Sequence, residues 1–180
     1  MQITGGFLNS RKIKMPSSPD VRPTLSKTRQ AFFNSLSSLI DFESKKFLDL
    51  FAGSGIMSFE AVSRGFKDVC SIEKSRKTID IIKQNCRILD VELNLIVGDS
   101  IKVISKMNET FDVIFIDPPY DSDLYDKSLK AVLSNKILNP GGIVALEHTK
   151  DKAVDLTGFV IIKQKEYSDK VITFLSIEKV

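Results

Sequence analysis

Cysteine and histidine, the usual ligands of zinc, are scarce in this sequence: it has two cysteines and one histidine, and it also has no tryptophan. Cys70 and Cys86 lack the paired spacing of a zinc site or of a disulfide framework, and His148 alone cannot complete a metal cluster. The longest apolar stretches have the length of a β-strand, well short of the ~20 residues that span a bilayer. We therefore expect a reduced, cytoplasmic, metal-free protein without a signal peptide or a transmembrane segment.

The net charge of +3 is unevenly distributed along the chain. Residues 1–46 carry eight Lys and Arg against three acidic residues, a net +5, so the remaining residues carry −2. A basic segment on a near-neutral body indicates a polyanionic partner, although a solvated charged surface explains the same composition. The 180 residues have the length of a single domain, in which we distinguish a basic extension (1–45) from a catalytic core (46–180).

The extension is predicted to contain a hairpin and a helix. Short segments at 2–4 and 12–15 are separated by turn residues, which indicates a basic hairpin. Thr24 is a candidate N-cap for a helix that runs to about residue 39, with apolar residues at helical spacing.

From residue 46 onward, strand patterns alternate with helix patterns. Strands are expected at 46–51, 68–73, 93–98, 111–117 and 142–148, and helices at about 55–64, 75–90, 100–107 and 123–134. This alternation predicts an α/β, Rossmann-like fold whose mostly parallel sheet has helices on both faces. Two final segments, 158–167 and 170–178, predict an antiparallel hairpin that completes a seven-stranded sheet. The sequence Asn-Pro-Gly-Gly at 139–142 predicts a turn.

The most informative stretch runs from Phe111 to Tyr120 and reads Phe-Asp-Val-Ile-Phe-Ile-Asp-Pro-Pro-Tyr. Its apolar run predicts a strand buried on both faces. Pro118 and Pro119 must end this strand, because proline has no N–H to donate to a sheet. Asp117 is therefore expected at the carboxyl end of a central strand, which is where open α/β sheets bind their ligands.

This motif has the groups needed to activate an amine. The Asp117 carboxylate and the Pro118 carbonyl can accept both hydrogens of an exocyclic amino group on a nucleobase. Two such acceptors localise the nitrogen lone pair and so favour attack on an electrophilic methyl group. Tyr120 would stack on the base and hold it in line with the methyl donor. The competing interpretation is a rigid turn after a strand, without a catalytic role.

A second motif, Asp49-Leu-Phe-Ala-Gly-Ser-Gly55, follows the first core strand and indicates a cofactor loop. Ser58 stands where a dinucleotide fingerprint would have its third glycine. The next strands end at Glu73, suited to ribose hydroxyls, and at Asp99, suited to an adenine amino group. Four carboxylates at strand ends thus form an acidic site: Asp49, Glu73, Asp99 and Asp117. Such a site favours a cationic adenosine cofactor, S-adenosylmethionine, over a pyrophosphate. The candidate cofactor residues are Asp49, Phe51, Gly53, Gly55, Glu73, Asp99 and Ser100.

With these motifs in place, the sequence resembles the bacterial 16S rRNA (guanine(966)-N2)-methyltransferase family, which has the class I methyltransferase fold. The glycine loop and Asp-Pro-Pro-Tyr occur in many amino-group methyltransferases, whereas the N-terminal block is more specific. That block comprises Gly5-Gly6, Ser10-Arg-Lys-Ile13, Arg22-Pro-Thr24 and Arg29-Gln-Ala-Phe-Phe-Asn34.

The resemblance implies S-adenosylmethionine-dependent methylation of guanine N2 in 16S rRNA, with S-adenosylhomocysteine as the other product. It also implies that the basic extension meets RNA, and we expect a monomer acting on an assembling 30S subunit. The candidate RNA contacts are Arg11, Lys12, Arg22, Thr24 and Arg29, of which Arg22 and Thr24 can equally serve the cofactor. Arg29 lies off the apolar face of the predicted helix, so it can meet either a phosphate or a carboxylate. The alternatives are an adenine-N6 methyltransferase acting on DNA or RNA and a non-catalytic RNA-binding factor.

Two further residues have open or minor roles. His148 follows the fifth core strand, but a structural role is favoured because water can take the proton of the methylated amine. Tyr125 is equally compatible with a second aromatic near the base and with helix packing.

Overall fold

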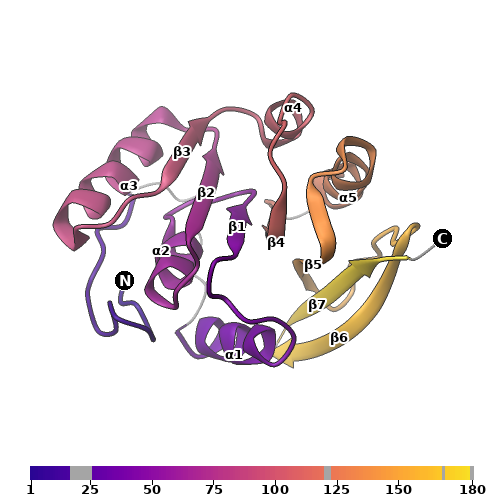
Figure 1. Cartoon of the computed structure of the whole chain (residues 1–180), viewed down its shortest axis with the longest axis horizontal. Coiled ribbons are helices and arrows are strands. Elements are labelled where there is room, and N and C mark those ends of the chain that lie inside the picture. Colours follow the sequence, from indigo (N-terminus) through magenta and orange to yellow (C-terminus); the bar gives the residue numbers. More distant parts are fainter. Residues whose placement is uncertain (17–25, 120–122, 168, 179–180) are drawn as a thin grey trace.

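One seven-stranded sheet lies at the centre of the molecule (Figure 1). The computed structural model describes residues 1–16, 26–119, 123–167 and 169–178. Its strands are β1 (Lys46–Asp49), β2 (Asp68–Glu73), β3 (Asn94–Val97), β4 (Phe111–Ile116), β5 (Leu138–Thr149), β6 (Phe159–Tyr167) and β7 (Lys170–Ile177). Its helices are α1 (Ser26–Ser37), α2 (Ile56–Ser63), α3 (Arg76–Leu89), α4 (Ser100–Ile104) and α5 (Leu124–Asn135).

The strand order, β3-β2-β1-β4-β5-β7-β6, confirms the predicted Rossmann-like class I methyltransferase fold. The first five strands in this order pair in parallel, and β7 is antiparallel to both β5 and β6. The chain builds outward from β1 in one direction and from β4 in the other. The sheet therefore has its topological switch point between β1 and β4, where such sheets bind ligands.

Helices cover both faces of the sheet, so β4 is buried on each side (Figure 1). Val113 and Phe115 face the core that contains residues of α1, α2 and α3. Ile114 and Ile116 face the core that contains residues of α4 and α5. A strand buried on both faces needs apolar side chains at every position, which explains the unbroken apolar run in its sequence.

The basic extension is attached to α2 by hydrogen bonds. Its hairpin is short, with an antiparallel bridge between Gln2 and Lys12. The Thr4 N–H donates to the Glu60 carboxylate at 2.8 Å, and the Leu8 N–H donates to the Ser63 hydroxyl at 2.8 Å. The hairpin prediction is thus confirmed in outline, while the predicted helix start at Thr24 lies outside the described residues.

The predicted boundaries differ from the structure most clearly in two places. Residues 139–142, predicted as a turn, belong to the irregular beginning of β5, where the register against β4 shifts between Phe111 and Val113. Helix α4 ends at Ile104, three residues earlier than predicted. No helix among the described residues is both long and apolar enough to cross a membrane.

Candidate active site

Carboxylates gather where the central parallel strands end. Asp49 is the last residue of β1 and Glu73 the last of β2, while Asp117 follows β4 directly. Glu147, which the sequence reasoning did not single out, lies near the end of β5. The strand-end rule that selected the first three carboxylates would also have found Glu147, because it follows the apolar run 143–146.

The glycine loop turns tightly between β1 and α2. Gly53 and Gly55 have φ angles of 51° and 76°, in the left-handed region that favours glycine. A Cβ atom on Gly55 would lie 3.1 Å from the Ile82 side chain of α3. The Gly53 N–H donates to Glu73 Oε2 at 3.0 Å, so the end of β2 holds the loop in place.

Asp49 is a buried carboxyl with one oxygen unused. Its Oδ2 accepts a hydrogen bond of 2.7 Å from Ser58, whose hydroxyl in turn accepts one from Ser71. Its Oδ1 has no hydrogen-bond partner among the residues that the structure describes. Burial raises the pKa of Asp49 to about 7, the negative charge of Glu73 adds to this, and the Ser58 hydrogen bond opposes it. A buried acceptor of this kind fits the predicted cationic cofactor, because the cation would favour the ionised form.

The other predicted cofactor residues surround this loop. Glu73 Oε1 accepts from the Ser75 N–H at 2.7 Å, and Asp99 caps α4 by accepting from the Lys102 N–H at 3.1 Å. Ser100 is buried and donates to the Leu50 carbonyl at 2.6 Å, which ties α4 to the end of β1. Phe51 is half-buried against the core that contains α4 and α5. These contacts fix the backbone around the predicted site, and the cofactor contacts themselves stay predictions.

Asp117 and the two prolines follow β4 as predicted. The Asp117 side chain is partly exposed, Pro118 is buried and Pro119 is exposed. Tyr120 lies outside the described residues. Burial raises the pKa of Asp117 to about 8, with the charges of Glu147 and Asp49 adding to the shift and Lys170 opposing it.

Glu147 is buried beside Asp117 and is 1% exposed. Its Oε1 accepts a hydrogen bond from the Lys170 ammonium group on β7, which also forms an ion pair with it. Its Oε2 has no hydrogen-bond partner in the described part of the chain. The candidate site therefore contains two buried carboxyls with an unused oxygen, one on each side of Asp117.

His148 and Tyr125 take part in the scaffold. The His148 ring nitrogens contact the Thr149 carbonyl at 2.9 Å and the Thr173 hydroxyl at 3.0 Å, in agreement with a structural role. Tyr125 is 2% exposed in the core beneath α5, so its ring serves helix packing.

The predicted RNA contacts lie in different environments. Arg11 and Lys12 are exposed on the hairpin, and Arg11 donates to the Ile88 carbonyl at 3.2 Å. Arg29 is fully buried: its Nε donates to Glu60 at 3.1 Å and its Nη2 donates to the Gln2 carbonyl at 2.5 Å. This burial corrects the predicted RNA contact and confirms the alternative of a carboxylate partner, because Arg29 binds the extension to Glu60 of α2. Arg22 and Thr24 lie outside the described residues.

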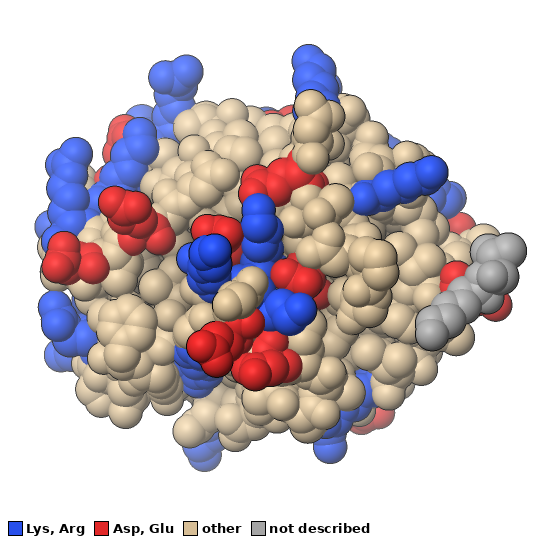
Figure 2. All heavy atoms as spheres, viewed as in Figure 1, with Lys and Arg blue, Asp and Glu red and all other residues tan. Residues whose placement is uncertain are grey.

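Charges of both signs are interspersed over the face of the molecule in Figure 2. Among the described residues, this face therefore presents no broad basic surface.

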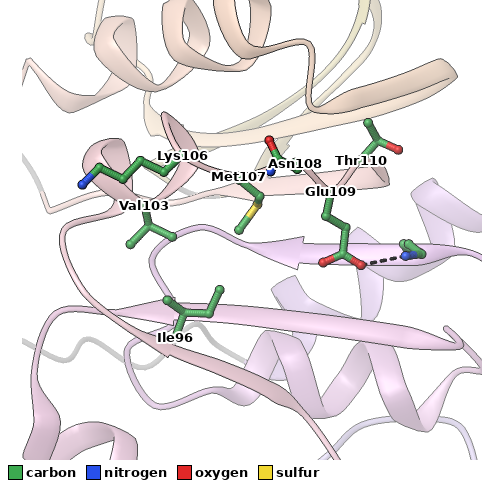
Figure 3. A pocket seen from close by; sticks show the side chains of 8 residues that line it. Ile96, Val103, Lys106, Met107, Asn108, Glu109 and Thr110 are labelled. Carbon is green, nitrogen blue, oxygen red and sulfur yellow. Dashed lines mark hydrogen bonds and ion pairs between the residues drawn. The ribbon is translucent and has the colours of Figure 1, made fainter.

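A pocket of about 660 Å³ lies away from the carboxyl edge of the sheet. Figure 3 shows its lining, which comes from β3, from α4 and the segment after it, and from Lys46 at the start of β1. The Lys46 ammonium group donates to Glu109 at 2.7 Å, the dashed contact in the figure. Since Lys46 and Thr110 precede or begin their strands, this pocket is separate from the strand-end carboxylates. The described residues contain no group of three His, Cys, Asp or Glu that could hold a metal ion.

Comparison with known proteins identifies the family of this chain. The family described as Conserved hypothetical protein 95 matches residues 1–176. The ribosomal RNA small subunit methyltransferase D of Buchnera aphidicola (subsp. Acyrthosiphon pisum) is 30% identical over 179 residues, which cover 97% of this chain and 92% of that protein.

Solved structures share the fold. A putative methyltransferase from Escherichia coli superposes with a TM-score of 0.86 at 22% identity, covering 99% of this chain and 98% of that one. A putative methyltransferase complexed with SAH superposes with a TM-score of 0.65 at 17% identity, covering 84% of this chain and 49% of that one. From its match over residues 1–176 and its 30% identical relative, this chain belongs to the Conserved hypothetical protein 95 family, which groups it with the ribosomal RNA small subunit methyltransferase D proteins.

Proposed function

We propose that this protein transfers a methyl group from S-adenosylmethionine to the exocyclic N2 of a guanine in small-subunit rRNA, at guanine 966. The names of its relatives support rRNA as the substrate class. The observation that carries the chemistry is the position of Asp117, directly after the buried central strand β4 and fixed by Pro118 and Pro119. S-adenosylmethionine, when bound, supplies a methyl group activated by a sulfonium.

The acidic edge supports a cationic cofactor. Asp49 has a buried oxygen without a partner among the described residues, and Glu73 holds the loop between them through the Gly53 N–H. In our proposal Asp49, Glu73 and Asp99 hold the cofactor, with Phe51, Gly53, Gly55 and Ser100 shaping its cavity. A negatively charged pyrophosphate would be repelled by the same groups.

The amine is held by two acceptors of different kinds. The Asp117 carboxylate accepts one N2 hydrogen and the Pro118 carbonyl accepts the other, which localises the lone pair on nitrogen as positive charge develops there. Only the ionised carboxylate compensates that charge fully. We infer that the target base is flipped out of its stack to reach this corner, and that Tyr120 stacks on it.

The exposed hairpin residues Arg11 and Lys12 are our candidates for contact with RNA phosphates. Lys and Arg side chains that neutralise phosphates supply much of the affinity of proteins for nucleic acids. A hairpin of about fifteen residues offers little surface for RNA. We therefore propose that the substrate is a partly assembled small subunit. We also propose that the enzyme acts as a monomer.

Product mapping tests this function. Small subunits from a strain without the modification are incubated with the protein and labelled S-adenosylmethionine, and the modified nucleoside is identified. We expect N2-methylguanine; N6-methyladenine would refute the guanine assignment, and absence of transfer with intact RNA binding would favour a non-catalytic factor. Asp117→Asn should reduce turnover by more than 100-fold with cofactor affinity within a few-fold. Asp80→Asn, at a 68% exposed position on α3, is the matched control and should change neither.

A further inference from the structure

Glu147 has an oxygen whose purpose the scaffold does not explain. The residue is 1% exposed, and its Oε1 is bound by Lys170. Its Oε2 is buried and has no hydrogen-bond partner among the described residues. Buried carboxylate oxygens are almost always hydrogen-bonded in native proteins, so this oxygen is a candidate acceptor for a ligand.

Strand register places this oxygen near the proposed amine site. In the parallel pair of β4 and β5, Ile116 is the partner of Leu146, so the next residues, Asp117 and Glu147, lie side by side. Successive side chains of a strand point to opposite faces, so Asp117 and Glu147 lie on the same face of the sheet as Phe115 and Ala145. That face packs against the core that contains residues of α1. The influence of Glu147 on the pKa of Asp117 is consistent with this closeness.

The chemistry of the guanine edge matches this pair of carboxylates. Next to its N2 amino group, guanine carries an N1–H donor, whereas adenine carries an N1 lone pair next to its N6 amino group. Two neighbouring acceptors thus fit guanine: one for the amine and one for N1–H. Adenine would place its lone pair against a buried carboxylate oxygen.

We propose that Glu147 determines base specificity, its free Oε2 accepting the N1–H of the guanine whose N2 is held by Asp117 and Pro118. This inference rests on the proposed function and adds the reason for guanine over adenine. Lys170 is a positioning residue, because its bond to Oε1 directs Oε2 toward the base.

The test uses a base that keeps the N2 amine but loses the N1–H. Small subunits are reconstituted with either guanine or 2-aminopurine at the target position, since 2-aminopurine has the same amine beside an N1 lone pair. The wild-type protein should prefer guanine by about 100-fold or more in kcat/KM, because a site built to accept a hydrogen bond rejects an analogue without the donor. A wild-type preference below ten-fold would overturn the inference without any variant.

Glu147→Gln supplies the second arm. Lys170 donates only, so it holds the amide oxygen and directs the amide NH₂ to the former Oε2 position. That NH₂ and the N1–H of guanine are both donors and repel each other, whereas the NH₂ can donate a hydrogen bond to N1 of 2-aminopurine. The guanine preference should therefore fall at least ten-fold or invert. 2-Aminopurine also lacks the O6 atom of guanine, but this difference between the two bases is the same for both proteins.

Controls separate this role from a structural one and from failure of the proposed function. If Glu147 had only a structural role, Glu147→Gln would lower kcat/KM equally for guanine and for 2-aminopurine. An unchanged ratio of the two values would therefore overturn the inference. Thermal unfolding and cofactor affinity show whether the variant is folded, and Glu166→Gln, at a 65% exposed position on β6, should keep the wild-type ratio. If the wild-type protein yields N6-methyladenine, the proposed function itself fails; an unchanged ratio with N2-methylguanine as product removes only the role of Glu147.

Discussion

The pKa of Asp49 predicts how cofactor binding depends on pH. Burial raises this pKa to about 7, and a cationic cofactor favours the ionised carboxylate. If the cation binds only the ionised form, the competent fraction is about 0.1 at pH 6 and about 0.9 at pH 8. The dissociation constant for S-adenosylmethionine should therefore fall about ten-fold between these pH values, a change of ~1.4 kcal/mol in binding free energy.

Calorimetry in two buffers with different ionisation enthalpies measures both the affinity and the protons released. At pH 6 binding should release about 0.9 proton, and at pH 8 about 0.1. Asp49→Asn keeps the shape of the side chain but cannot titrate, so both the pH trend and the proton release should disappear. Asp80→Asn should retain both. A flat wild-type affinity between pH 6 and pH 8, or a trend that survives in Asp49→Asn, would refute the assigned role.

The same pKa predicts the stability of the protein without cofactor. Because the folded pKa is raised, from 3.8 to about 7, the contribution of Asp49 is fully present below pH 4 and is lost as pH rises through 7. This rise in the pKa of Asp49 corresponds to about 4 kcal/mol of unfolding free energy. Urea unfolding of the wild-type protein and Asp49→Asn at pH 5 and pH 8 should show the variant losing less stability over this range.

Two further predictions concern Asp117 and Arg29. At saturating cofactor, kcat/KM for the small subunit should rise with pH, with an apparent pKa near 8. The reason is that burial and the charge of Glu147 keep the Asp117 carboxyl protonated below this pH. A rise in kcat/KM that was complete below pH 6 would contradict this prediction. Arg29→Met should lower the free energy of unfolding by about 3–5 kcal/mol, because it leaves the buried Glu60 without one of its cationic partners. Denaturant unfolding measures this change, and a loss below 1 kcal/mol would rule out the structural role of Arg29.

The sequence predicted the parts of the site that depend on one strand at a time. Asp49, Glu73 and Asp117 are each found by asking which polar residue ends an apolar run. The carboxyl ends of parallel strands meet at one edge, so the three residues come together without knowledge of the tertiary structure. The unbroken apolar run of β4 also indicated its central place in the sheet.

Roles that depend on contacts between distant segments could not be predicted in this way. Lys170 meets Glu147 only because β7 pairs antiparallel to β5 in one particular register, which the sequence does not specify. Helical spacing placed Arg29 off the apolar face of its helix, where it could meet a phosphate or a carboxylate, and only the structure shows that its partner is the Glu60 carboxylate. Its burial arises because Gln2 and Glu60, far away in sequence, close around it.

Helix α2 has a consequence for any attempt to redirect the enzyme to another RNA. Its first turn follows Gly55 of the glycine loop, and its last turns hold the hairpin through Glu60 and Ser63. The hairpin and the glycine loop, which we propose binds the methyl donor, thus contact opposite ends of one short helix. Exchanging residues 1–15 alone would leave Glu60 and Ser63 of α2 without their hydrogen-bond partners in the hairpin. A chimaera therefore has to exchange the hairpin and α2 together, which would also alter the proposed donor-binding loop at the start of α2.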